Sequence, residues 1–109
     1  MALDCPRCAG SKLKPVREKR TGLTLGLCPK CGGLWFGGGD LPRMLGVPAA
    51  AFQPPEDALH VRRRCPVCRQ RMCALRFPNT LSEIEICETC LGVWLDEGEY
   101  EKIREALRR

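Results

Sequence analysis

The order of apolar and polar residues predicts short β-strands in the first half of the chain. Leu23, Leu25 and Leu27 alternate with smaller residues, which is the pattern of a strand with one buried face. Residues 34–36 are apolar and are expected to form the next strand, and the polar, basic stretch 12–20 fits an exposed strand before them. The first half should therefore contain a small antiparallel sheet of three strands.

A second group of strands is predicted in the other half. Residues 72–77 and 93–95 have the composition of strands, and residues 78–80 have the composition of a turn. Between them, isoleucines and glutamates alternate over residues 83–86. One face of that strand should therefore be buried and the other exposed to water. This group also predicts three strands.

Each group of strands is followed by a predicted helix. Residues 40–45 can form about one helical turn that ends at Gly46. After the last strand, Asp96 is expected to cap a longer helix at its N-terminus, with Glu99 completing a capping-box pair. The apolar stripe of this C-terminal helix consists of Tyr100, Ile103 and Leu107.

The two halves are copies of one pattern. Residues 28–40 and 87–99 carry two cysteines, a glycine, a tryptophan, a second glycine and an acidic residue at the same offsets. The repeat predicts a first unit at 1–46, a linker rich in proline and alanine at 47–60, and a second unit at 61–109. Units of about fifty residues seldom bury enough apolar surface to fold without a metal or disulfides.

Cysteine spacing indicates what stabilises these units. Eight of the nine cysteines form four pairs with two residues between partners, which is typical of metal ligands. The pairs are Cys5 and Cys8, Cys28 and Cys31, Cys65 and Cys68, and Cys87 and Cys90. The glycines two residues past a cysteine, which are Gly10, Gly33 and Gly92, should allow tight turns at positive φ. We expect two Zn²⁺ ions, each bound by the four thiolates of one unit, in a small, metal-stabilised, mainly β fold.

Two other arrangements use the same cysteines. In a cross-braced arrangement the first and third pairs would share one ion, but the long linker between Cys31 and Cys65 and the in-phase repeat oppose it. Sites of four thiolates also accept iron, which the spacing does not exclude. Because four protein ligands leave no open position for water, a hydrolytic enzyme is not expected.

Charge and apolar composition indicate which cellular compartment and which kinds of binding partner to expect. The formal net charge of +5 falls to about +1 when eight thiolates bind two Zn²⁺ ions, so bulk charge gives little support for nucleic acid. The first residues lack the basic and apolar regions of a signal peptide, and no apolar run reaches the length of a membrane span. With cysteines in metal-ligand spacing, we expect a cytoplasmic protein that does not bind membranes.

These motifs resemble the bacterial zinc-ribbon family named for the N-terminal ribbon of transcription factor IIB. The resemblance rests on two copies of C-P-x-C followed by C-x-x-C-x-G-x-W, a glycine and an acidic residue. The second copy matches closely through residues 94–99, whereas in the first copy Gly37 replaces the acid at the position of Asp96. The resemblance implies two tandem zinc ribbons, each with a three-stranded antiparallel sheet, and zinc binding by the eight paired cysteines. It does not imply a specific task.

Three kinds of function fit such a protein. The first is a non-enzymatic protein-interaction module that presents rigid strands and a helix to a protein partner. The second is binding of nucleic acid or association with transcription, and the third is thiol redox chemistry or zinc sensing. The nucleic-acid hypothesis rests on the acid-free stretch 62–76. Its expected phosphate contacts are Arg62, Arg63, Arg64, Arg69 and Arg71.

Four further residues are expected to have structural roles. Trp35 and Trp94 follow the metal loops and should cover the metal core. Cys73, the ninth cysteine, lies in phase with the apolar residues of its strand and should be a small buried side chain. His60, the only histidine, should be a solvated residue of the linker.

Overall fold

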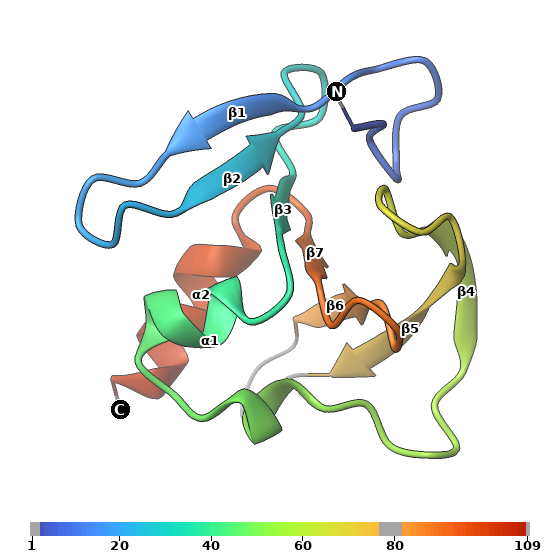
Figure 1. The fold of residues 1–109 in the computed structure, drawn as a ribbon. Helices are drawn as coiled ribbons and strands as arrows, with labels where there is room; N and C mark the ends of the chain where they lie inside the picture. The colour runs from blue at the N-terminus through green and yellow to red at the C-terminus, as the bar shows by residue number, and fades with distance from the viewer. Residues whose placement is uncertain (1–2, 77–81, 109) are drawn as a thin grey trace.

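The computed structural model describes residues 3–76 and 82–108, which form one antiparallel sheet with two helices packed beside it (Figure 1). The predicted turn at residues 78–80 lies outside the described residues. The mainly β, metal-stabilised fold class is confirmed. Neither helix in the described part of the chain has the length and apolar character needed to cross a bilayer.

The elements follow the sequence repeat. The first repeat contains β1 (Lys14–Arg17), β2 (Thr24–Leu27), β3 (Leu34–Phe36) and α1 (Asp40–Leu45). The connecting segment contains the short 3-10 helix η1 (Ala49–Phe52). The second repeat contains β4 (His60–Arg64), β5 (Arg71–Arg76), β6 (Glu83–Ile86), β7 (Val93–Leu95) and α2 (Glu99–Leu107). As predicted, α1 ends at Gly46, which adopts the left-handed conformation that closes a helix.

The two repeats share one sheet where two separate three-stranded sheets were predicted. The strand order is β1-β2-β3-β7-β6-β5-β4, and the last strand of each repeat pairs with the last strand of the other. In this antiparallel junction Trp35 lies directly opposite Trp94. Both short strands are apolar along their length, so pairing them buries surface that a single ribbon would expose.

Each tryptophan packs against a glycine of the other repeat. A Cβ atom on Gly33 would lie 2.2 Å from Cζ2 of Trp94, and a Cβ atom on Gly92 would lie 2.3 Å from Cζ2 of Trp35. These glycines are therefore required by the close approach of an indole ring. The prediction of positive φ is confirmed for Gly10, at 80°, but it is wrong for Gly33 and Gly92. The left-handed residues of these two loops are Gly32 and Leu91, one position earlier.

The apolar residues form two clusters. One cluster contains Phe36 of β3, Ile86 of β6 and Ile103 of α2, together with buried side chains of α1. Tyr100 of α2 stacks on Phe36, with ring centroids 5.9 Å apart, so the second helix covers a strand of the first repeat. Figure 1 shows α1 and α2 side by side, as this shared cluster requires.

The second cluster surrounds the paired cysteines. It contains Trp35, Trp94, Leu13 and Met72, all of which are buried, and it includes cysteines of both repeats. The prediction that the two tryptophans cover the metal core is therefore confirmed.

Ion pairs connect the repeats at the surface. The Arg7 guanidinium lies 3.6 Å from the Asp96 carboxylate, and the Arg69 guanidinium lies 2.5 Å from that of Asp4. Lys12 also contacts Asp4. These partly exposed pairs contribute little stability individually. They connect the first cysteine loop of the first repeat to two segments of the second repeat, its first cysteine loop and the turn before α2.

The predicted cap of the C-terminal helix is only partly present. Helix α2 begins at Glu99 after Gly98, which adopts φ 88°, and Asp96 is not its N-cap. The Asp96 carboxylate instead accepts hydrogen bonds from Arg63 and from the indole N–H of Trp94. The other half of the capping box does form, because the backbone N–H of Asp96 donates to the Glu99 carboxylate at 2.7 Å.

Strand β4 was not predicted, and it explains the burial of Glu85. Glu85 lies on the face of β6 that was predicted to be in contact with water, but it is only 9% exposed. Arg63 of β4 reaches across and donates to the Glu85 carboxylate at 2.6 Å. Burial raises the pKa of Glu85, and the nearby guanidinium opposes this shift.

The segment between the repeats also contributes to the fold. Phe52 in η1 is 5% exposed and belongs to the same apolar cluster as Ile103. His60, predicted to be a linker residue, is the first residue of β4. Residues 47–60 therefore include packed structure as well as connecting chain.

Candidate metal centres

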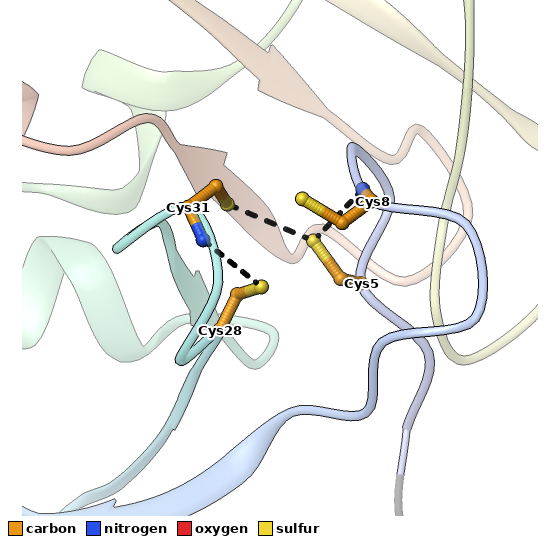
Figure 2. Close-up of side chains that lie close together, drawn as sticks. All are labelled: Cys5, Cys8, Cys28 and Cys31. Carbon is orange, nitrogen blue, oxygen red and sulfur yellow. Dashed lines mark hydrogen bonds between the residues drawn. The ribbon is translucent and has the colours of Figure 1, made fainter.

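The first group of four cysteines lies on two loops that face each other (Figure 2). Cys5 and Cys8 belong to the loop before β1, and Cys28 and Cys31 belong to the loop between β2 and β3. Backbone hydrogen bonds close each loop, from the N–H of Cys5 to the carbonyl of Ser11 and from the N–H of Cys28 to the carbonyl of Gly33. These hydrogen bonds turn the backbone of each loop so that its two sulfurs face those of the other loop.

The sulfur positions fit a tetrahedral zinc ion. All four Sγ atoms lie within 4.8 Å of one another, and those of Cys5 and Cys31 are 3.9 Å apart. Zn–S bonds of about 2.3 Å place tetrahedral ligands about 3.8 Å apart. The group can therefore hold one Zn²⁺ ion with little movement of the backbone.

Hydrogen bonds to sulfur favour the thiolate form at one position. Burial acts to raise the pKa of Cys28, but hydrogen bonds from Ser11 and from nearby backbone N–H groups bring it down to about 6. Burial raises the pKa of Cys5 to about 12. Four sulfurs at this spacing cannot all ionise without a cation, and a divalent ion supplies the missing positive charge.

The second repeat builds an equivalent group from Cys65, Cys68, Cys87 and Cys90. Its Sγ atoms also lie within 4.8 Å of one another, and those of Cys68 and Cys87 are 3.4 Å apart. The backbone N–H of Gln70 is the main cause that lowers the pKa of Cys68 to about 7. Burial raises the pKa of Cys90 to about 12. This group can also hold one Zn²⁺ ion.

Both groups combine the two cysteine pairs of a single repeat. The cross-braced alternative would bring Cys5 and Cys8 together with the pair at Cys65 and Cys68, and the structure does not do this. The sequential arrangement therefore supplies two four-cysteine clusters, each able to bind one zinc ion.

The five arginines proposed for phosphate contacts divide into two sets. Arg63 and Arg69 are engaged in ion pairs, with Glu85 and Asp96 in the first case and with Asp4 in the second. Arg62, Arg64 and Arg71 are exposed and form no ion pair within the part of the chain that the structure describes. These exposed guanidinium groups can reach a ligand, although that of Arg64 also donates to the backbone carbonyl of Arg69 at 2.9 Å.

The ninth cysteine lies outside both groups. Cys73 is fully buried, as predicted, and its thiol donates to the Glu88 carboxylate at 3.2 Å. Burial, followed by the effect of Glu88, raises its pKa to about 11. His60 contacts the same carboxylate at 2.5 Å and is therefore not a purely solvated residue. The grouping of His60, Cys73 and Glu88 was not predicted, because cysteines were considered as metal ligands only where they form C-x-x-C pairs. All three are nevertheless metal-ligating residue types.

Ser11 should increase the affinity of the first four-cysteine cluster for zinc. Replacing it with alanine removes the hydroxyl that donates to Cys28 Sγ at 3.4 Å. We expect the S11A variant to bind zinc about tenfold more weakly at this site, because the hydrogen bond from Ser11 favours the thiolate form of Cys28, which is the form that binds zinc. Competition with a chromogenic chelator measures the change. The matched control is Thr89→Val, which removes a loop hydroxyl that donates to Gln70 and to no sulfur. Equal affinities in S11A and wild type would show that the serine has no such role.

The comparisons with known proteins agree with the repeat. A family model described as transcription factor zinc-finger matches residues 4–46 and again residues 64–106. The comparison with curated proteins and the comparison with solved structures give no match.

Proposed function

Because the chain belongs to the transcription factor zinc-finger family, we propose that it is a non-enzymatic binding module whose partner is a protein. In each four-cysteine cluster, four thiolates would take all tetrahedral positions of a bound zinc ion, so neither ion would offer a position to a substrate. The description of the family favours transcription as the setting for such a module. The structural support is a surface that both repeats build together.

An apolar groove of about 560 Å³ carries the proposal. It lies beside β1 and β2, and its lining includes Leu13, Pro15, Leu25 and Trp35 from the first repeat. Val67, in the first cysteine loop of the second repeat, also lines it and is 56% exposed. An exposed apolar surface with a defined shape is typical of a protein-binding site.

The charges beside the groove indicate the chemistry of the partner. Strand β1 is an edge strand, and all four of its residues are exposed, including Lys14 and Arg17. Arg17 lies directly opposite Thr24, which lines the groove. Pro15 lacks a backbone N–H, which makes this edge a poor template for adding a strand. A protein segment that combines apolar side chains with acidic neighbours therefore fits the groove better than a purely backbone-paired strand.

An NMR titration tests this proposal. The probes are a designed peptide that combines leucines with glutamates and, separately, a random-sequence DNA duplex. We expect the peptide to shift the amide signals of β1 and β2 and the indole signal of Trp35. Val67→Asp should weaken peptide binding about tenfold, because it removes apolar contact area and adds a like charge. Leu59→Asp is the matched control, since Leu59 is 80% exposed and does not line the groove.

The proposal predicts that the control binds as wild type does. If the peptide causes no shifts at these residues, or if both variants bind it equally, the groove is not the binding site. If only the DNA binds, the second candidate function replaces the first.

Nucleic-acid binding is the second candidate, and one observation favours it. Arg64 of β4 lies directly opposite Arg71 of β5, and like charges in that position destabilise a sheet unless an anion lies between them. Arg62 is exposed on the same strand. If DNA binds, replacing these three arginines with alanine should lower the salt slope by about 0.9 for each phosphate contact. Arg63 must be left intact, because it holds Glu85 and Asp96.

A further inference from the structure

Three potential metal ligands converge beside the second zinc site without belonging to it. They are Nε2 of His60, Sγ of Cys73 and an oxygen of Glu88, and all three atoms lie within 4.8 Å of one another. The Glu88 oxygen is 2.5 Å from the His60 nitrogen and 3.2 Å from the Cys73 sulfur. Nitrogen, thiolate sulfur and carboxylate oxygen are the three ligand types that Zn²⁺ uses in proteins.

The sheet and the second zinc site hold these residues in place. His60 of β4 is the register partner of Cys73 of β5, so the two side chains start from adjacent positions across the strands. Glu88 directly follows Cys87, and the backbone of Cys87 is hydrogen-bonded to Gly92 and to Leu91. The position of Glu88 therefore depends on the same loop that presents Cys87 to zinc.

The first repeat lacks this group. Counted from the matching cysteines, Cys73 corresponds to Leu13 and Glu88 corresponds to Pro29. Leu13 is buried, so an apolar side chain fills the equivalent core position in a ribbon of the same plan. The ribbon itself therefore does not require a thiol at this position or a carboxylate beside it.

We propose that His60, Cys73 and Glu88 form a third metal site, which binds Zn²⁺ in tetrahedral geometry with its fourth position open to water. Binding displaces the thiol proton of Cys73, which leaves to solvent. The proton that His60 Nε2 donates to the Glu88 carboxylate must also leave Nε2, and the ring keeps a proton on Nδ1, so that the lone pair of Nε2 coordinates the ion. One thiolate and one carboxylate then balance the two positive charges of the ion. His60 and Glu88 are both about half exposed, so their side chains can separate to accept the ion.

The open position distinguishes this site from the two four-cysteine clusters. Three protein ligands and one water are the arrangement of zinc sites that keep one coordination position open, in contrast to closed structural sites. With a single thiolate, the third site should bind zinc more weakly than either cluster and exchange it more readily. This inference does not depend on the proposed protein partner.

Cobalt titration of the full chain, already loaded with two equivalents of zinc, tests the proposal. We expect one further equivalent of Co²⁺ to bind, with the visible spectrum of tetrahedral cobalt and a charge-transfer band from one thiolate. His60→Ala and Glu88→Gln should each weaken this binding at least about tenfold. Cys73→Ser should abolish the charge-transfer band. Elemental analysis of the same samples should show that both zinc ions remain bound.

The matched control is Glu83→Gln, an exposed carboxylate on β6 that lies outside the group. It should bind the third equivalent as wild type does. Because His60 and Glu88 are surface residues, their variants remain informative even if Cys73→Ser disturbs the core. Binding of only two metal ions by the wild type would overturn the proposal. A third equivalent that is retained in H60A and E88Q would do the same.

Discussion

Removing both zinc ions should unfold the whole chain. A structural zinc contributes about 10–16 kcal/mol in small domains, which is as large as the total stability of most folded proteins. The paired cysteines are part of the cluster that contains Trp35 and Trp94, so losing the metal removes the support of the sheet junction as well as of the loops. Chelation followed by circular dichroism and by the dispersion of amide NMR signals measures the effect.

Loss of the zinc site in the first repeat should also affect the second repeat. Cys31→Ser should prevent tight zinc binding in the first repeat, and it should also reduce the protection of amide hydrogens in β7, because β7 pairs with β3. In two independent ribbons, the second repeat would keep its protection unchanged. A native-like amide spectrum after complete removal of zinc would contradict the expectation that the whole chain unfolds without its two zinc ions.

Substituting a glycine at the junction should have the second large effect. In Gly33→Ala the new methyl group would lie 2.2 Å from Cζ2 of Trp94 and 3.1 Å from the carbonyl oxygen of Leu95. Because Trp94 is fully buried, its ring can move only by displacing its neighbours in the core. We therefore expect a loss of about 2–3 kcal/mol in the free energy of unfolding. Gly92→Ala should cost a similar amount, because it meets Trp35 in the same way. Denaturant unfolding of the zinc-loaded protein measures both.

Gly37→Ala is the matched control for these variants. Its Cβ atom would meet only the carboxylate of Asp40, at 3.2 Å, and that side chain can rotate away. The substitution should therefore be close to neutral. If Gly33→Ala and Gly37→Ala have the same stability, the indole does not pack on Gly33 as described.

Sequence patterns predicted those features that have local causes. The spacing within each C-x-x-C pair and the repeat of the whole motif were enough to group the eight cysteines into two clusters. Gly46 marked the end of α1, because a helix of this kind closes with a left-handed residue. The apolar positions of β6 were correct for Ile84 and Ile86, both of which are fully buried.

The joining of the repeats has no such local cause. The apolar composition of β3 and β7 shows that both strands are buried, but it does not show that each is the partner of the other. The roles of Gly33 and Gly92 follow only from that pairing, since each accommodates a tryptophan of the other repeat. A strand with two buried faces gives no alternation from which its neighbour could be inferred.

Strand β4 and its contacts were missed for a related reason. The basic run at Arg62–Arg64 is typical of a solvated surface, and sequence alone does not show that Arg63 lies against Glu85 and Asp96. The same pairs explain why Asp96 does not cap α2. Both partners are more than twenty residues from Arg63, so only the folded sheet brings them together.

The most direct test of the joined sheet is a measurement of nuclear Overhauser contacts in the zinc-loaded full chain. The structure predicts contacts between the backbone protons of Trp35 and Trp94, and between those of Phe36 and Val93, as antiparallel neighbours require. These contacts join the repeats and build the groove that we propose for a partner. Contacts confined to strands within each repeat, with none between β3 and β7, would contradict the account.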